Sequence, residues 1–167
     1  MERDDRDRLL GIYLNDHLAG STIGRELIRR AAGSNADNDL GRFLTALERE
    51  VAADREALLA VMAALGVRPS RAKVGAAWAA EKAGRLKLNG RIVRYSPLSC
   101  VLELEGLAIG IRAKRAMWHL LGVLGDERLA SFDFPALVTR ADAQLADVER
   151  THADVARATF RRTPPAP

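Results

Sequence analysis

The sequence predicts an all-α protein built from four long helices. Apolar residues recur at alternating spacings of three and four along four stretches, and capping residues, Gly and Pro stand at the ends of those stretches. The composition agrees, because Ala and Leu dominate and aromatic residues make up only 5% of 167 residues, which suits packed helices better than a β-sandwich. We expect a single domain over residues 1–161 and a disordered, Pro-rich tail over 162–167.

The first two helices are predicted to form a hairpin. The first spans about 5–32, and a turn rich in candidate N-caps follows at 33–39. The second spans about 37–65 and ends at Gly66. Its inward seam alternates spacings of four and three and comprises Leu40, Leu44, Leu47, Val51, Asp54, Leu58, Val61 and Leu65.

A long crossover, 67–96, separates the two halves of the chain. Ser70 caps an expected short helix over about 71–84, and Asn89-Gly90 between alternating runs predicts a β-hairpin over 86–95. Residues 68–94 carry a net charge of +7, within a chain whose total is +4. Such a surface suits an acidic protein, anionic lipid or nucleic acid, with contact residues Arg85, Lys87, Arg91 and Arg94. A merely solvated face is the alternative, because stacking aromatics are few.

The second helical hairpin starts at Ser96-Pro97, a hydroxyl cap followed by proline at the first helical position. Its first helix runs to about residue 124, and its second opens at Asp133, with Pro135 just inside, and runs to about Phe160. Two helical hairpins joined by one long crossover have the connectivity of a ferritin-like bundle.

Several polar residues fall on faces that the periodicity turns inward. His17 lies in the seam of the first helix, and Glu50 and Asp54 lie one turn apart on the second. In the third long helix Glu103 and Glu105 point about 200° apart, and the apolar stripe lies with Glu103, which we therefore place inward. In the last helix His152 lies in the seam and Glu149 flanks it. Buried carboxylates need partners, so the set requires an explanation.

Carboxylates and imidazoles from several helices are the ligands that iron, manganese and zinc take. In these features the chain resembles the ferritin-like superfamily of di-iron carboxylate proteins, in which two helices provide one Glu each and two provide Glu-x-x-His. Glu149-x-x-His152 matches that motif, and Glu103 matches a lone Glu. The second helix has Ala53 where the family has His, and the first offers His17 where the family has Glu. The resemblance implies a divalent Fe, Mn or Zn site, in complete or degenerate form, built from His17, Glu50, Asp54, Glu103, Glu149 and His152.

Two alternatives stay open. One is a metal-free buried network, in which His17 and His152 pair with the carboxylates and Arg112 turns inward to balance charge. The other is a non-catalytic bundle that acts through its basic crossover. The sequence does not decide whether the protein is an enzyme or a homodimer. A single cysteine, a charged N-terminus and the lack of a long apolar run predict a cytoplasmic protein without a membrane segment.

Overall fold

A computed structural model describes residues 3–70 and 96–161 of the chain. They form four long helices, α1 (Arg3–Ser34), α2 (Asp39–Ala64), α4 (Pro97–Val123) and α5 (Phe134–Phe160), with a short 3₁₀ helix, η1 (Glu127–Leu129), between the last two. No described residue lies in a strand. The prediction of an all-α protein is confirmed, and the ends of the four long helices lie within about two residues of the predicted ones.

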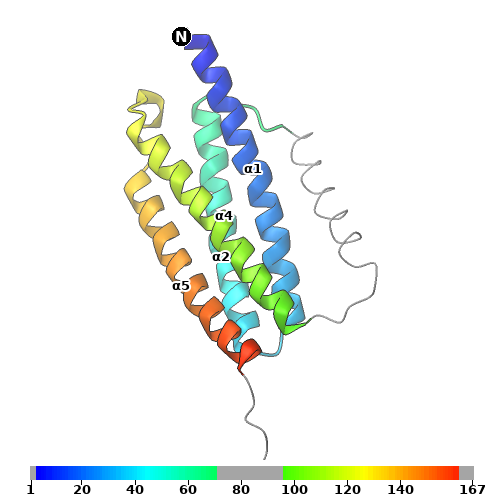
Figure 1. The fold of residues 1–167 in the computed structure, drawn as a ribbon. Helices are drawn as coiled ribbons and strands as arrows, with labels where there is room; N and C mark the ends of the chain where they lie inside the picture. Colours follow the sequence, from blue (N-terminus) through cyan, green and yellow to red (C-terminus); the bar gives the residue numbers. More distant parts are fainter. Residues whose placement is uncertain (1–2, 71–95, 162–167) are drawn as a thin grey trace, which may run out of the picture.

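The four helices pack side by side as a bundle (Figure 1). Helix α1 packs against α2 and α4, α4 packs along α5, and α2 meets α5 more sparsely. The chain runs down α1 and up α2, then up α4 and down α5 (Figure 1). The end of α2 and the start of α4 therefore lie at opposite ends of the bundle, as one long connection between two hairpins requires.

The ends of the helices follow the predicted local chemistry. Asn38 caps α2 by accepting a hydrogen bond from the Gly41 amide, and Asp133 caps α5 by accepting one from the Ala136 amide. Ser96 does the same for α4, whose first residue is Pro97. After α2 the chain turns at Gly66, where φ is 70° and the absence of a side chain removes the steric penalty.

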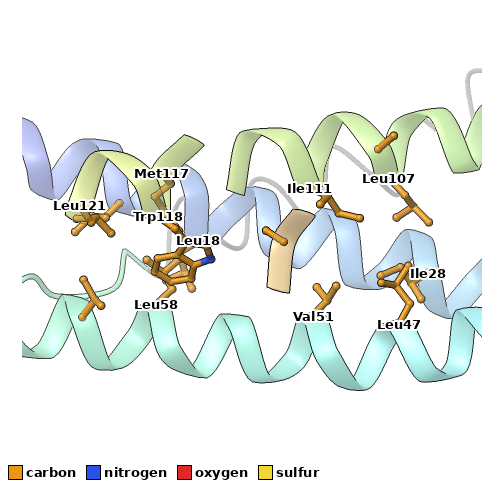
Figure 2. Close-up of a cluster of buried hydrophobic side chains, with 14 of the residues drawn as sticks. Leu18, Ile28, Leu47, Val51, Leu58, Leu107, Ile111, Met117, Trp118 and Leu121 are labelled. Atoms are coloured by element: carbon orange, nitrogen blue, oxygen red, sulfur yellow. The ribbon is translucent and has the colours of Figure 1, made fainter. Parts of the chain in front are cut away.

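A continuous apolar core fills the space between the helices (Figure 2). Trp118 of α4 is its largest fully buried side chain and packs near Leu18 of α1 and Leu58 of α2. Further along the bundle, Leu107 and Ile111 of α4 face the side of the core that Val51 lines (Figure 2). The predicted inward seam of α2 supplies much of this core, because Leu44, Leu47, Val51, Leu58, Val61 and Leu65 are all buried.

Three predictions fall outside the described residues. The short helix over 71–84 and the β-hairpin over 86–95 lie in the crossover, which is described only at its two ends, and the tail begins at residue 162. Among the helices that are described, none is long and apolar enough to cross a membrane.

Candidate functional site

A buried carboxylate, Asp54, lies at the meeting point of α2, α4 and α5. It is only 3% exposed, so its charge requires compensation from the protein. Lys114 of α4 donates a hydrogen bond to Asp54 Oδ2, and Arg140 of α5 lies in ion-pair contact with Oδ1. Two cations from two different helices therefore share one buried carboxylate.

Gln144 of α5 completes this group. It is 2% exposed; its Nε2 donates to Asp54 Oδ2 at 3.1 Å and to Glu50 Oε2 at 3.0 Å, while its Oε1 accepts a hydrogen bond from Lys114. The amide thus links the carboxylates of Glu50 and Asp54 to the ammonium group of Lys114. Burial lowers the pKa of Lys114, and the charge and hydrogen bond of Asp54 oppose that shift.

Beside this network, a cavity of about 440 Å³ opens between α1, α2 and α4. This volume falls in the range of small-molecule sites in proteins. The floor consists of buried side chains, and Gly residues of α1 and α4 form much of the rim. The lining comprises Tyr13, Asp16, His17, Gly20, Ser21, Gly24, Ile28, Val51, Asp54, Arg55, Leu58, Gly106, Leu107, Gly110, Ile111, Ala113, Lys114, Met117 and Trp118.

The glycines explain why the space is open. A Cβ atom added at Gly20, Gly24 or Gly110 would meet no atom within 4 Å. An alanine would therefore fit at each of these positions without a clash, and it would gain helix propensity of about 0.8–1.0 kcal/mol. The glycines thus lower the helix propensity of α1 and α4 and leave space beside them unfilled.

Most of the surface that lines the cavity is apolar, although several lining residues carry a polar group. Trp118 is fully buried, yet its Nε1 has no hydrogen-bond acceptor among the residues that the structure describes. In Figure 2 the indole nitrogen lies at the edge of the ring nearest Ile111 and Val51, which also line the cavity. A buried N–H without an acceptor costs about 1–3 kcal/mol. A ligand that accepted a hydrogen bond from this N–H would recover that cost.

His17 is a further member of the wall. Its ring meets that of Tyr13 edge-on, with centroids 4.6 Å apart. Burial lowers the pKa of His17, although the neighbouring charge of Asp16 opposes the shift. No hydrogen bond between described residues joins His17 to Asp54 or to any other predicted metal ligand, so the imidazole favours its neutral form.

The other predicted ligands of α4 and α5 are paired elsewhere. Glu103 is buried, as predicted, but it accepts a hydrogen bond from Arg30 Nε at 3.0 Å. The prediction that Glu149 faces inward is wrong, because this side chain is exposed and pairs with Arg112. The alternative of a metal-free network predicted that Arg112 balances a charge. Arg112 does balance the charge of Glu149, but at the surface and not in the core.

His152 also lacks the predicted partners. Its side chain is 31% exposed, and its Nε2 lies 3.3 Å from Oε1 of Glu105, the carboxylate predicted to face outward. Glu50 is likewise exposed, although it reaches Gln144. The Glu149-x-x-His152 motif therefore lies on an outer face of the hairpin between α4 and α5.

These residues do not fit a di-iron centre as arranged here. Within residues 3–70 and 96–161, no three His, Cys, Asp or Glu side chains gather where they could hold a metal ion. Asp54, the most buried of the predicted ligands, already forms ion pairs with Lys114 and Arg140. Their positive charges compensate the carboxylate, as a metal ion would in a metal site. The metal centre stays a prediction from the sequence. The predicted basic contact residues Arg85, Lys87, Arg91 and Arg94 lie outside the described part of the chain.

Sequence reasoning missed the residues that compensate Asp54. Gln144 had a detectable signal, because it lies three residues after Ala141 and four before Val148, both fully buried on the seam of α5. Lys114 likewise follows Ile111 by three and precedes Trp118 by four on the most apolar helix. A polar residue on the buried seam of a helix faces the core, as Asp54 does, and is therefore a candidate partner for Asp54.

The chain was also compared with known proteins. No protein-family model, curated protein or solved structure matches it. The site must therefore be interpreted from its own geometry.

Proposed function

We propose that this protein binds a small, largely apolar molecule in the cavity between α1, α2 and α4. The observation that carries the proposal is the fully buried Trp118, whose Nε1 has no acceptor within the described helices and whose side chain lines a space of about 440 Å³. Apolar walls with a small number of polar groups are the usual composition of such sites.

Two further features support binding rather than a packing defect. A core normally closes voids larger than a water molecule, yet this space stays open beside glycines of α1 and α4 at which an alanine would fit. The buried network of Asp54, Lys114 and Gln144 then holds one wall in place, since its hydrogen bonds join α2, α4 and α5.

The connectivity supports a relationship to ferritin-like bundles as part of the same proposal. Helices α2 and α4 run in the same direction and are joined by the long connection (Figure 1), as in bundles with one crossover. In this proposal the core of the bundle retains a ligand site between facing helices, while the carboxylates among its predicted metal ligands are paired with cations or hydrogen-bond donors.

The test uses octan-1-ol as an apolar probe. The sequence has two tryptophans, so Trp78→Phe in the full chain leaves Trp118 as the only one. We expect octan-1-ol to cause a saturable change in the fluorescence of Trp118. Gly24→Leu and Gly110→Leu, from opposite walls, should fill the space and weaken binding at least about tenfold, which is 1.4 kcal/mol. Gly33→Leu is the matched control, because Gly33 is exposed on α1, has no atom within 4 Å of an added Cβ, and lies outside the lining.

Equal affinity in the parent and in both cavity-filling variants would refute the proposal, as would a lack of saturable binding in the parent. Sedimentation of the same proteins provides a second arm. If Gly24→Leu converted a dimer into a monomer, the space would belong to a second copy of the chain and not to a small molecule.

A further inference from the structure

Two hydrogen-bond donors lie together on the wall that α4 gives to the cavity. Lys114 and Trp118 are four residues apart in the helix, so their side chains share one face, and both line the space. An ammonium group has three N–H donors. Asp54 and Gln144 accept two of them from Lys114, and no acceptor within the described residues takes the third.

The charged side chains around this wall differ in how much of their surface is exposed to solvent. Asp54 contacts two cations, of which Lys114 is 15% exposed and Arg140 is 39% exposed, and Arg55 at the wall pairs with exposed Glu56 at 3.5 Å. The opposing carboxylates, Glu50 and Asp16, are exposed to solvent, where water and salt screen their charges strongly. Lys114 is therefore the cation of this wall that solvent screens least.

On these grounds we propose that the ligand is an apolar molecule with a carboxylate group, whose oxygens accept hydrogen bonds from Lys114 Nζ and Trp118 Nε1. This inference rests on the proposed function and specifies its ligand class. The hydrocarbon part would lie against Ile28, Leu107 and Ile111, which expose 5% or less of their surface. Such a ligand satisfies both donors, and its hydrogen bond to Lys114 is charge-assisted at both ends.

The experiment is isothermal titration calorimetry on the full chain with three eight-carbon probes: octanoate, octan-1-ol and octylamine. We expect octanoate to bind at least about tenfold more tightly than octan-1-ol, and octylamine to bind most weakly. Lys114→Met should bring the affinities for octanoate and octan-1-ol to within about twofold of each other. Arg112→Met, an exposed cation on the same helix outside the lining, should leave the preference unchanged.

Because Lys114→Met leaves Asp54 with one cation fewer, the double variant Asp54→Asn/Lys114→Met repeats the measurement with a neutral pair. Trp118→Phe provides an independent check, because it removes a donor that has no partner among the described residues; it should weaken octanoate binding about tenfold. A preference for octanoate that persists in Lys114→Met, or octan-1-ol binding as tightly as octanoate to the parent, would overturn this inference while leaving the cavity as an apolar site. Absence of binding by all three probes would instead overturn the proposed function.

Discussion

Substituting Asp54 by alanine should be among the most destabilising single changes in this chain. The substitution removes the carboxylate but leaves Lys114, whose side chain is only 15% exposed, with its charge buried. Arg140 is 39% exposed and can turn toward solvent. Gln144 retains Glu50 as one acceptor for its amide.

The magnitude follows from the cost of an uncompensated buried charge. Breaking a buried ion pair by removing one partner costs about 3–5 kcal/mol. Since Lys114 keeps one acceptor in Gln144, we expect the lower half of that range, about 3–4 kcal/mol. For a chain of this length that corresponds to a fall in Tm of roughly 6–16 °C.

Urea denaturation monitored by circular dichroism measures this change directly. Asp142→Ala is the matched control, because Asp142 pairs with Arg115 at the surface, where both side chains are more than 40% exposed; it should cost less than about 1 kcal/mol. In Asp54→Ala/Lys114→Met the buried charge is gone, so the double variant should recover at least about 1 kcal/mol. A cost below about 1 kcal/mol for Asp54→Ala, or strictly additive effects in the double variant, would refute this account of the network.

Three other predictions test separate parts of the structure. Burial lowers the pKa of His17, so below about pH 6.5 the unfolded chain binds more protons than the folded one, and the free energy of unfolding falls as the pH falls. His17→Gln should therefore reduce the change of the urea midpoint between pH 7.5 and 5.5. A Cβ at Gly41 would overlap the backbone carbonyl of Asn35, so Gly41→Ala should lower the free energy of unfolding by about 1–3 kcal/mol, whereas Gly33→Ala should raise it by about 0.5–1 kcal/mol. Elemental analysis of protein purified without chelator should find Fe, Mn and Zn well below one atom per chain; near-stoichiometric metal that is lost in His152→Ala would restore the predicted metal centre.

The helices could be predicted from the sequence because their signals are local. Asn38, Ser96 and Asp133 lie beside the amides that they cap, and Pro97 and Pro135 lie within the first turns of their helices. Burial of Glu103 rather than Glu105 also followed from periodicity alone. Each of these features depends on residues only a few positions apart.

The site could be predicted only in part because its partners come from different helices. Asp54 was identified as a buried carboxylate, but periodicity does not show which cation on another helix meets it. Lys114 and Arg140 are 60 and 86 positions away from it. For Glu149 and His152 the error was one of depth, because the last buried residue of α5 is Val148 and the seam beyond it is partly exposed to solvent. A cavity leaves still less trace, because it depends on glycines from two helices that meet across the core.

The most direct test of the ligand site is the position of a bound probe. Isotope-filtered NMR on the ¹³C- and ¹⁵N-labelled chain with unlabelled octan-1-ol would report nuclear Overhauser effects between the probe and individual protein protons. We expect effects between the methylene groups of the probe and the Trp118 indole, the Ile111 methyl groups and the Ile28 methyl groups, all of which line the cavity. Effects confined to exposed apolar residues outside the cavity, such as Leu102 or Val123, would contradict the assignment of this space as the binding site.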